Sequence, residues 1–155
     1  MPATGRKKIH HRGHRDHRET RWVFLCVLCG ALQAAELPVR PALLELSAAL
    51  EDGNAARFLA MFDKKRCPDY GKLEGNVVAL VAQYDVGSSV GIVDQAPEGD
   101  AVELKLDWLL RLRPSSGGPA VERRGQLRCR LEPRGKKWKV VSLEPVSFFS
   151  AIVTR

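Results

Sequence analysis

Residues 102–112 read VELKLDWLLRL, and this alternating stretch decides the fold class. Every even-numbered residue in it is apolar, whereas every odd-numbered residue except Leu109 is charged. Successive side chains of a strand point to opposite faces, so we expect the even-numbered side chains to be buried and the odd-numbered ones to face water. The stretch therefore predicts a long strand of an antiparallel sheet that is apolar on one face.

A first hairpin is predicted through the loop PSSGGP at residues 114–119. The register that keeps apolar residues opposite one another places Trp108 opposite Gly125. The same register sets Glu103 against Arg130 on the outer face, where opposite charges attract. Both faces therefore support one alignment.

A second hairpin is predicted through PRGK at residues 133–136. The register that continues the apolar face places Trp138 opposite Leu131 and Ser142 opposite Leu127. Trp138 is then expected in the core, and Ser142 is expected to point inward.

The residues before the long strand change from a helical to a strand period. Apolar residues at helical spacing predict short amphipathic helices at 41–50, 54–62 and 69–84, and the last two begin with a capping residue. A strand follows at 86–93, with its turn at 95–100. Three helices followed by a four-stranded meander predict an α+β fold with the helices covering one sheet face.

The N-terminal residues have the pattern of a targeting signal that precedes this domain. Residues 1–21 hold seven basic and two acidic residues and all four histidines, so the basic charge of the chain gives no argument for nucleic-acid binding by the rest. Residues 22–35, WVFLCVLCGALQAA, are almost wholly apolar. We expect a cleaved export signal ahead of a domain at 36–155, with an uncleaved membrane anchor as the alternative. A run of this length is short for a spanning helix, which needs about 20 residues.

Two groups of N-terminal residues have spacings that also occur in metal or redox sites. Cys26 and Cys29 have redox or metal spacing but lie inside the apolar run, which favours a signal segment. His10, His14 and His17 are spaced to share a helix face, although a solvated basic leader is the simpler interpretation. We expect no metal and no cofactor.

Cys67 and Cys129 are the cysteines of the predicted domain. An oxidising compartment would allow them to form a disulfide. Because Cys129 is predicted to point inward and the separation of the two residues is not fixed by the sequence, their pairing is left open.

A family resemblance rests on the ends of these elements. Phe62-Asp63 closes the second helix, GKKWKVVSL at 135–143 forms the last strand, and Pro145 and Phe148-Phe149 follow it. Over residues 41–149 the chain resembles the nuclear transport factor 2-like superfamily, which includes SnoaL-like and ketosteroid isomerase-like proteins. The resemblance implies a cone: three helices packed on a strongly bent four-stranded sheet, with a pocket at the open end and frequent dimerisation through the sheet. Functions of such folds are diverse, so the fold does not assign one.

The catalytic groups of that superfamily do not map onto this sequence. Dehydratase-like members resemble one another in a pocket His-Asp pair, but residues 22–155 contain no histidine. Ketosteroid isomerase-like members combine an aspartate base with an oxyanion hole that includes a tyrosine. The tyrosines here, Tyr70 and Tyr84, both lie on the third predicted helix and do not align with that group.

A few polar or aromatic residues are predicted to line the inner face and its mouth. Arg123, opposite Leu110, would either bind an anion there or extend past the sheet edge into water. The other pocket candidates are Ser142, Tyr84, Asp94 and Trp108. For Asp94 a turn position, and for Trp108 a core position, is the competing interpretation.

These observations predict an exported, non-catalytic module that binds a small hydrophobic or anionic ligand or a protein. The alternative is a pocket enzyme of the isomerase or cyclase type that acts on a small hydrophobic carbonyl compound. We expect a homodimer formed through the sheet, no nucleic-acid partner, because no aromatic residue interleaves the outer charges, and no membrane contact after signal cleavage.

Overall fold

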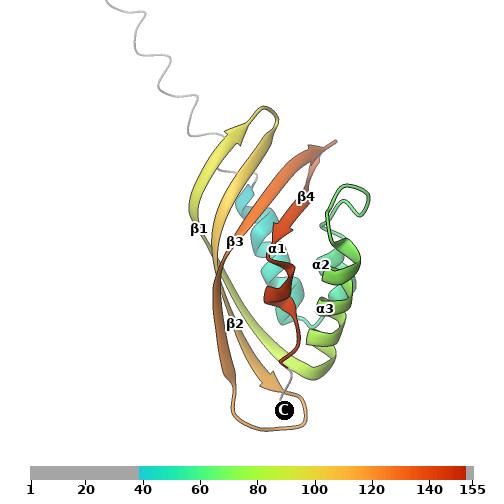
Figure 1. Ribbon diagram of the computed structural model, residues 1–155, viewed down its shortest axis with the longest axis vertical. Helices are drawn as coiled ribbons and strands as arrows, with labels where there is room; N and C mark the ends of the chain where they lie inside the picture. Colours follow the sequence, from blue (N-terminus) through green and yellow to red (C-terminus); the bar gives the residue numbers. More distant parts are fainter. Residues whose placement is uncertain (1–38, 153–155) are drawn as a thin grey trace, which may run out of the picture. The chain divides into compact units, whose positions relative to one another are not determined.

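The computed structural model describes residues 39–152, and residues 1–38, with the basic leader and the apolar segment, lie outside this range. The helices are α1 (Val39–Glu51), α2 (Ala55–Leu59) and α3 (Tyr70–Gln83). The strands are β1 (Tyr84–Glu98), β2 (Ala101–Pro114), β3 (Val121–Arg134) and β4 (Lys137–Glu144), followed by the 3-10 helix η1 (Val146–Phe149). The sheet order β1-β2-β3-β4 confirms the predicted α+β meander (Figure 1).

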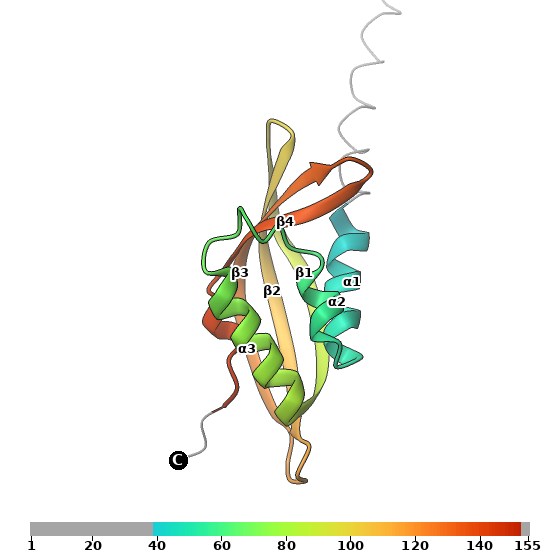
Figure 2. The same cartoon turned by 90° about the vertical axis from the view of Figure 1, so that its right-hand side faces the viewer.

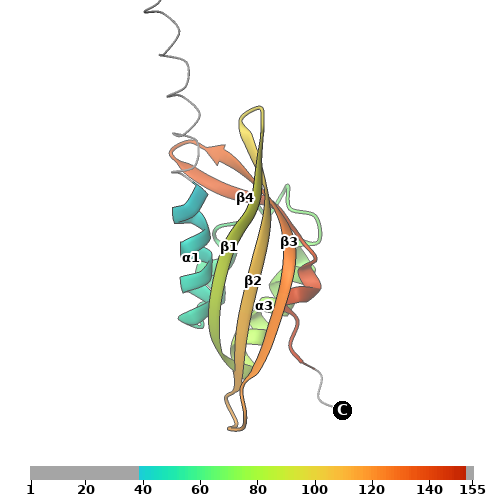
Figure 3. The same cartoon turned by 90° about the vertical axis from the view of Figure 1, so that its left-hand side faces the viewer.

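The three helices lie on one face of a curved sheet, and the outer sheet face is left uncovered by the described chain (Figure 3). α1 buries Leu43, Leu46 and Leu50 against the sheet. α2 is shorter than predicted, and the Asn54 side chain caps it by accepting a hydrogen bond from Arg57 N at 2.9 Å. None of these helices has the length and apolar character needed to cross a membrane.

The start of α3 differs in detail from the prediction. Asp69 occupies the N-cap position, but its φ of 56° is left-handed and its side chain makes no capping hydrogen bond. The carboxylate instead pairs with Lys72 at 3.0 Å.

The first predicted hairpin is confirmed. Trp108 pairs with Gly125, Glu103 with Arg130 and the intervening residues follow in the same register. The even-numbered side chains Leu104–Leu112 are buried, as the alternation predicted. Gly125 leaves room for the Phe148 ring, because a Cβ at this position would lie 3.0 Å from the ring and would push it aside.

The predicted register of the second hairpin is wrong. Only Gly135 and Lys136 form the turn, so Arg134 pairs with Lys137 and Trp138 with Pro133. Gly135 has a φ of 61°, which suits a two-residue hairpin turn. Trp138 is therefore only half-buried.

A bulge changes the second register again further along. The pairing shifts between Arg130 and Leu131, and Ser142 then lies opposite Arg130 rather than Leu127. A bulge adds one residue to one strand, which reverses the faces to which the following side chains point. Ser142 consequently lies beside outer-face residues such as Arg128 and Glu103.

The first strand is longer than predicted. β1 continues to Glu98, and the turn consists of Gly99 and Asp100 instead of residues 95–100. Gly99 adopts a φ of 62°, the conformation that a tight hairpin turn requires. A register shift lies between Ile92 and Asp94.

Aromatic rings fill the space between the helices and the inner sheet face. Trp108 meets Phe149 edge-on with the ring centroids 5.2 Å apart, and Phe149 contacts Phe148 at 5.2 Å and Phe58 at 5.5 Å. Phe58 contacts Phe62 at 5.3 Å. Such contacts contribute beyond their buried area.

A polar triad joins α1 to the sheet inside this core. Ser88 Oγ accepts hydrogen bonds from Ser47 Oγ at 2.8 Å and from Trp108 Nε1 at 2.9 Å. The buried indole N–H is thereby satisfied, and the end of α1 is fixed beside β1.

Candidate functional site

The C-terminal strap, residues 146–152, is held against the domain through its backbone carbonyl groups. Arg123 Nη1 donates to Phe148 O and to Ser150 O, both at 2.6 Å. The Tyr84 hydroxyl donates to Ile152 O at 3.2 Å, and Asn76 Nδ2 donates to Val146 O at 3.0 Å. Two of the predicted pocket residues, Arg123 and Tyr84, thus use polar groups to hold the chain's own backbone.

The other predicted site residues lie in separate surroundings. Trp108 is fully buried in the aromatic core. Ser142 is half-buried on the outer side of β4, and Asp94 is exposed on β1, where its carboxylate accepts a hydrogen bond from Gln95 N at 2.9 Å. The structure therefore does not bring the five predicted residues together at one site.

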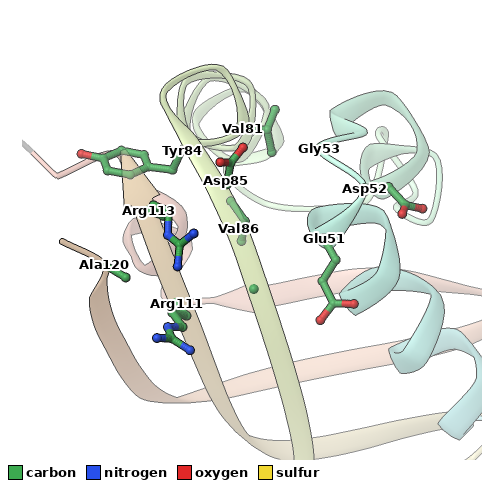
Figure 4. Close-up of a pocket in the computed structure, with 11 residues that line it drawn as sticks. Glu51, Asp52, Gly53, Val81, Tyr84, Asp85, Val86, Arg111, Arg113 and Ala120 are labelled. Atoms are coloured by element: carbon green, nitrogen blue, oxygen red, sulfur yellow. The ribbon is translucent and has the colours of Figure 1, made fainter. Parts of the chain in front are cut away.

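A different group of residues surrounds an open hollow of about 350 Å³, which we call the Arg111–Glu51 hollow (Figure 4). Figure 4 shows the arginines of β2 on one side of β1 and the end of α1 on the other. The lining residues are Glu51, Asp52, Gly53, Val81, Tyr84, Asp85, Val86, Gly87, Arg111, Arg113 and Ala120.

The basic side of the hollow consists of Arg111 and Arg113. They are two residues apart on β2, so their side chains leave the same sheet face about 7 Å apart. Within residues 39–152, neither guanidinium has a carboxylate oxygen within 4 Å. Gly87 faces Arg111 across the strand pair and has no side chain to fill the space between them.

Some of the carboxylates that line the hollow already have ion-pair or hydrogen-bond partners. Asp52 pairs with Arg57 at 2.8 Å, and Glu51 accepts a hydrogen bond from Ser88 N at 3.2 Å. Asp85, opposite Arg113 in the register, has no ion pair within the described chain. The hollow therefore offers two guanidinium groups on one side and carboxylate oxygens on the other.

The side chains around the hollow are arginines, carboxylates and small or apolar residues, with Tyr84 beside them. The lining residues include neither a histidine nor a cysteine. Across residues 39–152, no cluster of histidine, cysteine or carboxylate side chains has metal-binding geometry, and every buried side-chain N or O atom has a hydrogen-bond partner. The groups present can hold an anion by charge-assisted hydrogen bonds.

In the sequence Arg111 is one of the charged residues that the alternation of residues 102–112 directs outward, and Arg113 follows two residues later. Arg124 on the same face pairs with Asp107 at 2.5 Å, and this hydrogen bond lowers the pKa of Asp107. Arg111 and Arg113 differ from Arg128, which also has no ion pair within residues 39–152, because they line the hollow. The sequence feature that indicates this hollow is Gly87, which leaves space beside Arg111. That role is visible only once the β1-β2 register is known.

Cys67 and Cys129 are both free thiols and both buried. Burial raises the pKa of each thiol, so the reactive thiolate form is disfavoured. No disulfide joins them in the structure.

No protein-family model and no curated protein sequence matches the chain. Several solved structures, in contrast, are similar to it. A conserved protein from Planctomyces limnophilus matches with a TM-score of 0.63 and 12% identity, over 72% of this chain and 94% of that one. A hexachlorocyclohexane dehydrochlorinase matches with a TM-score of 0.57 and 12% identity, over 72% and 84%.

A nuclear transport factor 2-like superfamily protein from Salmonella enterica matches with a TM-score of 0.59 and 9% identity, over 73% of this chain and 90% of that one. At these identities the likeness concerns the fold. The order of elements, the meander and the position of the helices agree with it. This chain therefore has the fold of the nuclear transport factor 2-like superfamily.

Proposed function

We propose that residues 36–155 form an exported, non-catalytic module that binds a small anionic molecule in the Arg111–Glu51 hollow. The observation that carries this proposal is the pair Arg111 and Arg113, which line a hollow without an ion-pair partner in the described chain. A guanidinium offers several donors in a fixed plane, so two of them can grip one phosphate or carboxylate.

The opposite side of the hollow narrows the ligand class. Glu51 lies across β1 from the arginines and Asp85 lies beside Arg113, and their carboxylate oxygens repel a purely anionic ligand and attract donors. The ligand we propose has an anionic group for the two arginines and an amine or hydroxyl group for the carboxylates.

The pocket-enzyme alternative has less support. The name of the dehydrochlorinase shows that a similar fold can hold an active site, but at 12% identity this does not transfer to the chain. On the inner side Phe149 contacts both Trp108 and Phe148, and Arg123 holds the strap. A proton abstraction would need a base placed beside the substrate there.

The ligand is best sought first by native mass spectrometry of the protein purified from its own host. A panel of inorganic phosphate, citrate and amino acids, tested by ligand-observed NMR, extends the search. Replacing Arg111 and Arg113 together by glutamine is expected to weaken binding on the order of 100-fold, because two charge-assisted contacts are lost.

The matched control for that experiment is Arg128→Gln. Arg128 is an exposed arginine on the same sheet face, without an ion pair in the described chain, and it does not line the hollow. Equal binding by the wild type and the double variant would contradict the proposal.

Gly87 provides a steric test of the same hollow. Gly87→Val is expected to abolish binding, because the new side chain enters the space next to Arg111, whose Cβ lies 3.4 Å from the added Cβ. The free energy of unfolding should change by less than about 1 kcal/mol, since valine suits a strand. Gly91→Val, on the same strand but outside the hollow, should leave binding intact. Full binding by Gly87→Val would count against this location.

Export and dimerisation through the outer sheet face stay predictions. N-terminal sequencing of the protein from its host tests cleavage near residue 35, and light scattering after size-exclusion chromatography measures the number of copies.

A further inference from the structure

Two segments far apart in the sequence form a basic end of the domain, which we define as residues 63–66 and 132–139. Backbone hydrogen bonds join them: Asp63 N donates to Val140 O and Val140 N donates to Met61 O, each at 2.9 Å. Phe62 and Val140 form a parallel bridge at the same place. The basic end is therefore a fixed surface that neither segment forms alone.

The basic end holds seven basic and two acidic residues. Both carboxylates are already paired, Glu132 with Arg66 and Arg134, and Asp63 with Arg134. The hydrogen bond from Arg66 lowers the pKa of Glu132, which keeps this carboxylate ionised.

Five lysines remain as uncompensated charge. Among the described residues none of them has a carboxylate oxygen within 4 Å, and four are exposed. The five are Lys64, Lys65, Lys136, Lys137 and Lys139. Lys139 is half-buried and donates to Ala60 O. Half-buried Trp138 lies between two of them on β4.

The position of this surface indicates its partner. Figures 1 and 2 show the β3-β4 hairpin, the loop after α2 and the start of α1 at the same end of the domain, where the β1-β2 hairpin also extends. The tip of that hairpin carries Glu98, which pairs with Arg130, and Asp100. The apolar segment 22–35 ends four residues before Val39, and four extended residues span at most about 14 Å. A chain that keeps this segment in a bilayer would hold the basic end close to the lipid headgroups.

We propose that the basic end docks on an anionic lipid bilayer in the chain that keeps residues 22–35. Clustered lysines beside a membrane-inserting segment are attracted by anionic headgroups, and a tryptophan at the rim suits the interface. A lipid surface fits better than nucleic acid, because the lysines form no groove with a series of stacking rings. This membrane contact belongs to the alternative of an uncleaved membrane anchor, since no membrane contact is predicted after signal cleavage.

The test uses the full-length chain reconstituted in phosphatidylcholine vesicles with and without phosphatidylglycerol. Lysine acylation by an N-hydroxysuccinimide ester is followed by mass spectrometry. Acylation of Lys64, Lys65, Lys136 and Lys137 is expected to slow on the order of tenfold on the anionic vesicles, and high salt should restore it. Equal rates on both vesicles would overturn the proposal.

Charge reversal distinguishes docking through the basic end from nonspecific attraction between the protein and anionic vesicles. Lys136→Glu with Lys137→Glu should remove the protection of Lys64 and Lys65. The matched control, Lys105→Glu with Arg128→Glu, reverses two exposed charges that face each other on β2 and β3 and should keep the protection. Loss of protection in both variants would also overturn the proposal. Protection by an added oligonucleotide but not by phosphatidylglycerol would replace lipid with nucleic acid as the partner.

Discussion

Replacing Trp108 by alanine is expected to lower the free energy of unfolding by about 3–5 kcal/mol. Trp108 is fully buried, lies opposite Gly125 and packs its ring edge-on against Phe149. The truncation leaves a large cavity beneath the helices and removes the hydrogen bond from the indole to Ser88 Oγ. Urea unfolding followed by circular dichroism measures the change.

Trp138→Ala is the matched control. The actual β3-β4 register places Trp138 opposite Pro133 and leaves it half-buried, so its loss should cost only about 1 kcal/mol. The predicted register, with Trp138 opposite Leu131 in the core, would make the two substitutions similarly costly. Similar costs would therefore contradict the register described here.

Replacing Arg123 by methionine is expected to lower the free energy of unfolding by about 2–4 kcal/mol. Two charge-assisted hydrogen bonds, to Phe148 O and Ser150 O, disappear together. The strap should then separate locally from the domain, so amide exchange in residues 146–152 should accelerate more than exchange elsewhere. Hydrogen-exchange mass spectrometry resolves this segment.

Arg128→Met serves as the control, because Arg128 is exposed on the same strand and holds no backbone carbonyl. Unchanged exchange in the strap of the Arg123 variant would show that the buried phenylalanines and the hydrogen bonds from Tyr84 and Asn76 hold it without Arg123. Arg123 would then regain the role of an anion ligand at the mouth of the inner face.

Much of the fold was readable from local pattern. The alternation of Val102–Leu112 gave one buried face, and the match of charges on the other face fixed the β2-β3 register. The helices were found by their apolar spacing, although α2 ended early. The turn lengths were harder, because Gly99 and Gly135 each allow a tight turn that a cluster of turn-forming residues does not distinguish from a wider one.

The site was less predictable than the fold. Arg123 was correctly placed opposite Leu110, but the sequence did not show that residues 146–152 return to accept its hydrogen bonds. Ser142 was assigned to the inner face because a single bulge near Arg130 could not be foreseen. Arg111 and Arg113 were visible as charges, whereas Glu51 became their neighbour only through the packing of α1 on β1.

The sequence by itself determined the α+β class, the meander and the inner face of β2, because side-chain periodicity is a local property that burial enforces residue by residue. Tertiary structure decided the β3-β4 register and the strap held by Arg123. It also decided which arginines of the hollow have no ion pair within residues 39–152, and it brought two lysine-rich segments together at one end. Each of these depends on which distant groups meet, and a charge is paired or unpaired only after its neighbours in space are known.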